Sequence, residues 1–131
     1  MIEKYARHIY ATLGTGYSER IYHNAMEVLL RKHQVPYESE RIVPVEFEGH
    51  VIGNLRADII VDRRVVLEFK SIAKIGDKEE QQARNYLRLL NLGEAMLINF
   101  GKNFEIRRVV LSEEMSTSCT ENTAPCADTV P

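Results

Sequence analysis

Cysteine is scarce in this sequence, and its absence from most of the chain excludes two kinds of chemistry. Cys119 and Cys126 both lie among the last 20 residues. Residues 1–111 can therefore form neither a disulfide framework nor a site with a thiol nucleophile. The two thiols have no histidine near them, and they make a poor zinc site because structural zinc usually takes four nitrogen or sulfur ligands.

Long apolar runs are also missing. No stretch approaches the roughly 20 apolar residues that cross a bilayer. The first seven residues mix charged and apolar side chains and lack the apolar centre of a signal peptide. We therefore expect an intracellular, cytoplasmic protein that is not secreted and has no membrane partner. Apolar residues make up 44% of the chain and charged residues 27%, which is typical of one globular domain.

Strong net charge is the third missing feature. The chain of 131 residues carries a charge of −2, but its acidic residues are unevenly distributed. Residues 112–131 contain four carboxylates and no lysine or arginine, which together with their many Ser, Thr, Asn and Pro residues predicts a disordered acidic tail. Residues 1–111 form the predicted folded domain, with seventeen basic and fifteen acidic side chains, a net charge of +2. A net charge of +2 does not by itself indicate nucleic-acid binding, although a local basic patch can bind nucleic acid without a high net charge.

Hydrophobic periodicity predicts three helices. Apolar residues recur at helical spacing over residues 2–13, and Gly14 is placed as a C-terminal cap. A second helix is predicted from Ser18 to about residue 33, and Asp77 is placed as the N-cap of a third over about 78–90. The apolar face expected for the second helix comprises Ile21, Tyr22, Ala25, Met26, Val28, Leu29 and Leu30.

Five strands are predicted, over residues 38–47, 51–61, 65–70, 94–100 and 104–111. Pro44 indicates an edge strand or a bend, residues 48–50 form a turn, and Gly53 with Asn54 indicates a bulge. The element order is therefore ααβββαββ. Three antiparallel strands, a helix and a further strand pair predict an α/β (α+β) domain with a central mixed sheet flanked by helices.

Three charges interrupt the two central strands, which otherwise read as fully buried. These are Asp58 in the first strand and Glu68 and Lys70 in the second, and burying a charge without a partner is costly. Asp58 and Glu68 are equidistant from Arg63, so a loop of odd length centred there would place them opposite each other, with Cβ atoms roughly 4.5–5.5 Å apart. A two-residue loop would separate them onto opposite faces.

Two carboxylates at that distance repel, so one stays protonated or a cation lies between them. Mg²⁺ suits the site because it prefers oxygen ligands and keeps several waters. Lys70 shares a face with Glu68 and could steer a water or stabilise charge on a phosphate. The alternative is a structural ion pair at a sheet edge, in which Lys70 neutralises one carboxylate.

Gly16, Glu19 and Tyr22 form the second informative pattern. Glu19 falls in the first turn of the second helix, where a carboxylate interacts favourably with the helix dipole, and Tyr22 lies one turn further on. Without further information, Glu19 caps the helix and Tyr22 packs against the core. The three residues also match the pattern GxxExxY as written.

Taken together, these patterns resemble the GxxExxY protein family, a small branch of the PD-(D/E)xK nuclease superfamily. The resemblance covers roughly residues 2–110 and includes Asp58, the sequence Glu68-x-Lys70, and the segments 82–87 and 97–101. It implies a restriction-endonuclease-like fold with Asp58 and Glu68 as metal ligands and Lys70 as the catalytic lysine. It further implies that Glu19 assists the metal or a bound water and that Gln82 faces the site, whereas Tyr86 is expected to pack.

The resemblance therefore predicts a nuclease that hydrolyses phosphodiester bonds with Mg²⁺ or Mn²⁺, in DNA first, with RNA left open. Arg56, Lys74 and Arg84 are the candidate phosphate contacts, and for each the alternative is a solvated surface charge. Two rival functions stay open: a non-catalytic nucleic-acid- or protein-binding module, and a small-molecule hydrolase on the same carboxylates. No role is assigned to the four histidines. The oligomeric state is also open, although a homodimer would let so small a nuclease contact both strands.

Overall fold

A computed structural model describes residues 1–111 and confirms the predicted order of elements. The predicted tail, residues 112–131, lies outside the described residues. The helices and strands are α1 (Ile2–Leu13), α2 (Glu19–Lys32), β1 (Tyr37–Phe47), β2 (His50–Val61), β3 (Val65–Lys70), α3 (Asp77–Leu90), β4 (Glu94–Asn99) and β5 (Glu105–Val110). In residues 1–111 we find no helix of the length and apolar character that crossing a membrane would need.

The five strands form one mixed sheet in the order β1-β2-β3-β4-β5. Neighbouring strands are antiparallel except β3 and β4, which run parallel from the pair Val65 and Glu94 to the pair Lys70 and Asn99. A parallel pair needs a crossover connection, and α3 supplies it. The predicted mixed sheet is therefore correct, and β1 is the edge strand that Pro44 indicated.

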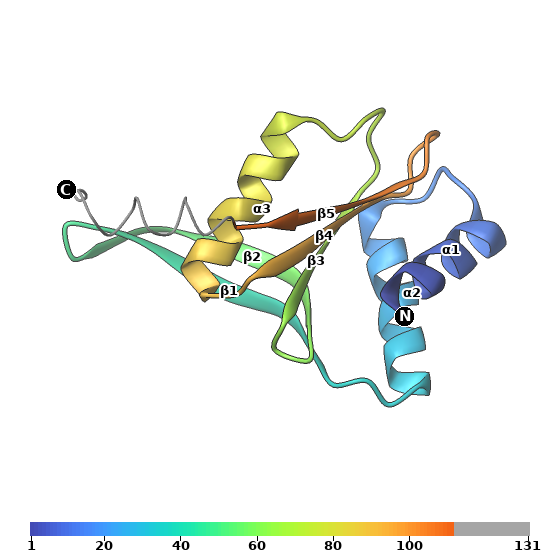
Figure 1. Ribbon diagram of the computed structural model, residues 1–131, viewed down its shortest axis with the longest axis horizontal. Helices are drawn as coiled ribbons and strands as arrows, with labels where there is room; N and C mark the ends of the chain where they lie inside the picture. Colours follow the sequence, from blue (N-terminus) through green and yellow to red (C-terminus); the bar gives the residue numbers. More distant parts are fainter. Residues whose placement is uncertain (112–131) are drawn as a thin grey trace.

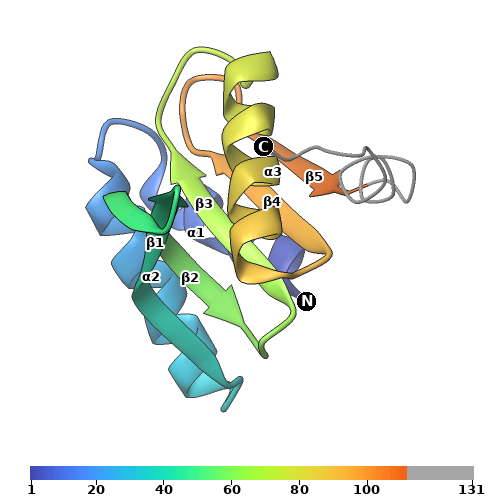
Figure 2. The same cartoon turned by 90° about the vertical axis from the view of Figure 1, so that its left-hand side faces the viewer.

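Helices cover both faces of this sheet (Figure 2). α1 and α2 pack on one face around a core that includes Ile59, Phe69 and Phe100. α3 packs on the other face, against Ile60, Val66 and residues of β4. Since side chains alternate along a strand, Glu68 and Lys70 belong to the α3 face, with Val66.

The β1–β2 hairpin extends well beyond the rest of the sheet (Figure 1). β3 pairs with β2 only at Ile59, Ile60 and Val61. Residues 41–56, called the arm below, therefore form a two-stranded ribbon. Its turn consists of Glu48 and Gly49, both with positive φ (53° and 80°), as in the tight hairpin turns that match strand twist.

Several predicted details need correction. The N-cap of α3 is Gly76 and Asp77 is its first helical residue, because the Glu79 side chain folds back to accept a hydrogen bond from the Gly76 amide at 2.7 Å. His50 belongs to β2 and pairs with Phe47. The bulge is at Ile52 of β2, one position before the predicted Gly53, because Ile52 has no paired residue where the register shifts opposite Val45 and Glu46.

The apolar face predicted for α2 is too wide. Ile21 and Val28 are 41% and 53% exposed, whereas Tyr22, Met26 and Leu30 are fully buried. The buried side chains of α2 form a narrow stripe that packs on the sheet. Beside this stripe, Ala25 and Leu29 are partly buried against the core that includes α1. Val28 is therefore an exposed apolar side chain beside α1.

Candidate active site

The two carboxylates lie where β2 and β3 separate. Backbone pairing ends at Ile59 and Leu67, and the same register continued by one residue places Asp58 opposite Glu68, as the three-residue loop predicts. Side chains replace the next backbone pair: the Phe69 amide donates to Asp58 Oδ2 at 2.9 Å, and the Asp58 amide points to Glu68 Oε2 at 3.5 Å. This crosswise arrangement fixes both carboxylates where the two strands separate, with Glu68 on the α3 face and Asp58 lining a cavity with residues of α2.

Glu68 is in an unfavourable environment for a negative charge. It is 7% exposed, and burial, followed by the Asp58 carboxylate, raises the pKa of Glu68 to about 8, although Lys70 opposes the rise. A divalent cation between the carboxylates would remove this penalty, because an opposite charge favours the ionised form. Two carboxylates and several waters are a common ligand set for Mg²⁺, so the residues present fit such an ion.

Glu19 does not join these carboxylates in a compact ligand cluster. Residues 1–111 contain no group of three His, Cys, Asp or Glu side chains gathered closely enough to hold a metal. Glu19 Oε2 instead accepts a hydrogen bond from the Ser71 amide at 3.3 Å, which ties the start of α2 to the segment after β3. Glu19 still lines a cavity of about 210 Å³ together with Asp58. A water could bridge the two.

Lys70 lies at the end of β3 on the same face as Glu68. Its Nζ donates to Gln82 Oε1 of α3 at 3.4 Å, so the structure brings together the predicted lysine and the predicted polar helix residue. A weak contact of this length leaves the ammonium group available to a ligand. Lys70 is partly exposed, which allows that approach.

Tyr86 packs as expected. Its ring is partly buried against the core under α3, and its hydroxyl donates to the Arg56 carbonyl at 2.8 Å. Burial, with the charge of Glu68 as the next cause, raises the pKa of Tyr86 to about 12. Tyr22 also packs, stacked on Phe100 with ring centroids 4.3 Å apart.

The three predicted phosphate contacts lie in different surroundings. Arg56 is exposed and lines the same cavity as Glu19 and Asp58. Lys74 is exposed in the segment between β3 and α3. Arg84 lies on α3, 3.7 Å from Glu80, and donates to Gln81 at 3.1 Å, so it is less available to a ligand than Arg56.

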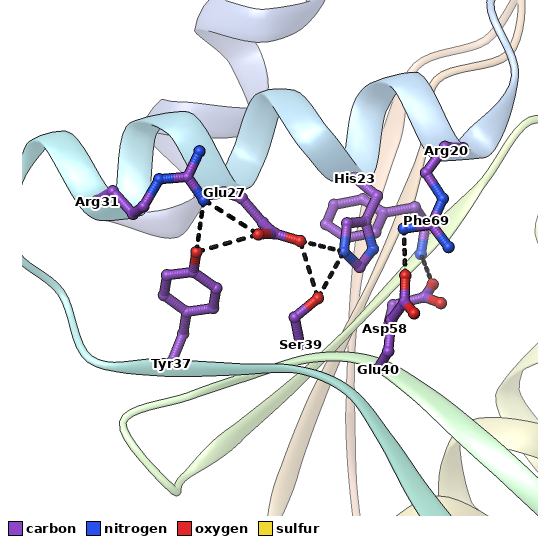
Figure 3. A network of polar contacts seen from close by, with 9 residues as sticks. All are labelled: Arg20, His23, Glu27, Arg31, Tyr37, Ser39, Glu40, Asp58 and Phe69. Atoms are coloured by element: carbon purple, nitrogen blue, oxygen red, sulfur yellow. Dashed lines mark hydrogen bonds and ion pairs between the residues drawn. The ribbon is translucent and has the colours of Figure 1, made fainter.

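His23 is a neighbour of the site that the sequence did not indicate. It is 3% exposed, its ring meets Phe69 edge-on at 5.6 Å, and it lines the cavity shared by Glu19 and Asp58. His23 Nε2 lies 2.6 Å from Glu27 Oε2 and 3.0 Å from Ser39 Oγ (Figure 3). The signal that could have revealed it is the i, i+4 spacing of residues 19, 23 and 27 on α2.

Further contacts of this network connect α2 with β1 (Figure 3). Glu27 Oε1 accepts from Tyr37 and Arg31, each at 3.1 Å. Burial opposes ionisation of Glu27, but hydrogen bonds from Ser39, His23 and Tyr37 outweigh it and lower its pKa. Arg20 forms an ion pair with Glu40 beside Asp58. The network therefore holds α2 in a fixed position over the site.

Asn99 supports the segment that follows Lys70. It is fully buried in β4, and a buried amide needs hydrogen-bond partners. Its side chain accepts from the amides of Ile72 and Gly101, each at 3.0 Å, and donates to the Ile72 carbonyl at 2.9 Å. A lone asparagine in the apolar segment 94–100 was the available signal for this role.

The chain belongs to the PD-(D/E)XK nuclease superfamily, because the model of that superfamily matches residues 1–109. The predicted superfamily and its fold are thus confirmed. The narrower assignment to the GxxExxY family stays a prediction. No curated protein sequence matches the chain.

Solved structures that resemble this fold include the following two. The crystal structure of SSO0001 has a TM-score of 0.55 and 21% identity, covering 73% of this chain and 52% of that one. An alkaline exonuclease (LHK-Exo) from Laribacter hongkongensis has a TM-score of 0.53 and 8% identity, covering 72% of this chain and 57% of that one. The matches therefore span little more than half of either solved chain, and at these identities they support the fold alone.

Proposed function

We propose that this protein is a divalent-metal-dependent nuclease that hydrolyses phosphodiester bonds in DNA. The observation that carries the proposal is the facing pair Asp58 and Glu68, with Lys70 beside it, at the point where β2 and β3 separate. Membership of a nuclease superfamily supports it. The substrate and the ion are part of the proposal.

Asp58 and Glu68 would hold the ion, because they supply the oxygen ligands of the site and the charge of Lys70 offsets the burial of Glu68 only in part. Glu19 would act through a bound water from the other wall of the cavity. When bound, Mg²⁺ or Mn²⁺ would lower the pKa of a water and polarise the scissile phosphate.

The protein's own groups would orient the substrate and stabilise charge. Lys70 presents an ammonium group next to the carboxylates, where it would offset the negative charge that develops on the phosphate. Gln82 restrains the lysine side chain through their 3.4 Å contact. Arg56 lines the adjoining cavity and would contact a neighbouring phosphate.

The first test is cleavage of labelled single- and double-stranded DNA and RNA with Mg²⁺ or Mn²⁺. Lys70→Ala should lower the cleavage rate by about 10²–10³-fold, as does removal of a group that stabilises developing charge. Lys102→Ala is the matched control, because Lys102 is an exposed lysine in the turn between β4 and β5. That variant should cleave at the wild-type rate.

An inactive wild-type protein would contradict the catalytic proposal if it nevertheless binds nucleic acid. In that case binding should survive both Glu68→Gln and Lys70→Ala, and the fold would serve as a binding module. Preferential cleavage of RNA would instead correct the substrate and retain the chemistry.

A further inference from the structure

The tip of the arm is apolar and exposed. Phe47, Val51 and Ile52 are 63%, 58% and 64% exposed, and the bulge leaves Ile52 outside regular pairing. Two carboxylates, Glu46 and Glu48, are exposed beside them. A two-stranded ribbon that shows this much apolar surface gains stability when another surface covers it.

The outer side of the two N-terminal helices offers an apolar groove. One cavity of about 240 Å³ between α1 and α2 has the apolar side chains Ile9, Leu13, Ala25, Val28 and Leu29 in its lining. A second cavity of about 650 Å³ continues it, because both include His8 and Leu29. The exposed side chain of Val28 belongs to this groove.

The rim of this groove is basic. Lys4, Lys32 and His33 line the second cavity, and all three are exposed. The arm tip thus combines apolar side chains with two negative charges, whereas the groove combines apolar side chains with two lysines. The two surfaces are complementary in both polarity and charge.

A single molecule cannot bring these surfaces together. The arm and the α1–α2 pair lie at opposite ends of the longest axis, with the rest of the sheet between them (Figure 1). Two copies placed antiparallel would meet at both ends, since the arm of each would reach the helices of the other. Such a reciprocal exchange is closed and two-fold symmetric.

We propose that the protein forms a homodimer in which the arm of each copy docks in the α1–α2 groove of the other. Phe47, Val51 and Ile52 enter the groove, and Glu48 faces Lys32. The exchange is independent of the proposed nuclease activity, because neither the arm tip (residues 46–52) nor the groove contains a residue of the candidate active site. Nucleic acid is a poorer occupant of the arm, since phosphates and the two glutamates repel each other.

The test is analytical ultracentrifugation of the full chain with exchanged charges. Glu48→Lys and Lys32→Glu should each weaken the dimer about tenfold, because each creates a like-charge contact in both interfaces. The double variant should restore it. An equimolar mixture of the two single variants should also dimerise, since the lysine introduced into one copy then meets the glutamate introduced into the other.

Truncation of the apolar anchor provides a second, independent measurement. Phe47→Ser should weaken the dimer by about 30-fold or more, as expected for a central aromatic side chain. The melting temperature of the diluted monomer should stay unchanged, because Phe47 is exposed in one copy. A wild-type chain that is monomeric at about 100 µM, or a dimer indifferent to all three substitutions, would overturn the proposal. Nucleic-acid binding lost with Phe47→Ser in a monomeric protein would assign the arm to that partner instead.

Discussion

At the scale of single residues, Glu68 has the clearest conflict between its chemistry and its position. Its carboxyl group is buried beside a second carboxylate, and its pKa is raised to about 8. In the unfolded chain the same group ionises near its ordinary pKa of 4.5. Between these values the unfolded state releases a proton that the folded state keeps, so stability falls as pH rises.

Glu68→Gln should therefore stabilise the metal-free protein in a pH-dependent way. In EDTA the gain should be small near pH 4.5 and grow to about 4 kcal/mol at pH 8, because glutamine carries no charge to bury. Urea unfolding of both proteins across this range measures the difference. Glu38→Gln is the control, since Glu38 is exposed and pairs with Arg41 at the surface. A gain that is constant with pH would show that Glu68 does not titrate as described.

The sequence predicted some residues of the site and missed others for a physical reason. Asp58 and Glu68 followed from strand parity and the position of Arg63, which are local properties. The roles of His23 and Asn99 depend on contacts made only in the folded chain. His23 contacts Phe69 and Ser39, and Asn99 contacts the backbone of Ile72. The sequence carries only indirect signals for them, the i, i+4 spacing of residues 19, 23 and 27 for His23 and a lone asparagine in an apolar strand for Asn99.

At the scale of elements, the β2–β3 loop controls the register on which the site depends. Asp62 and Arg63 both have positive φ, 53° and 56°, a conformation that costs most residues energy but not glycine. Arg63→Gly should thus leave the melting temperature unchanged or slightly higher. Deletion of Arg63 should be severe, because a one-residue slip moves every β3 side chain to the other face.

Thermal unfolding of the two loop variants measures this contrast. The deletion should lose the cooperative transition or lower the melting temperature by about 10 °C or more, equivalent to a few kcal/mol in a domain of this size. Equal stability of both variants would mean that the loop absorbs the missing residue and that register is fixed elsewhere.

The order of elements was predictable because each has a clear period and clear boundaries. Helix burial and the bulge were less predictable. Ile21 and Val28 are apolar yet exposed, since the width of a buried stripe depends on which neighbours reach the helix. The position of the bulge depends on the register in which two strands pair, and the residues of one strand do not determine that register.

At the scale of the whole molecule, metal binding should be visible as stability. An ion that binds only the folded state stabilises it by about 2.7 kcal/mol at 100 times its Kd, so Mg²⁺ or Mn²⁺ should raise the melting temperature by several degrees. Differential scanning fluorimetry at constant ionic strength, with EDTA reversal, measures this shift. Lys70→Ala should retain it, whereas Glu68→Gln should lose most of it. No shift in the wild type would argue against the metal site.

The short contact between β2 and β3 also has a mechanical consequence. Three residue pairs join these strands, whereas six join β3 to β4 and ten join β1 to β2. The pairing of β2 with β3 is therefore the weakest in the sheet, and the arm extends from β2. Asp58 lies on β2 and Glu68 on β3, so an ion held by both carboxylates would join the two strands. Loading the site would then stiffen the whole sheet and set the angle at which the arm projects.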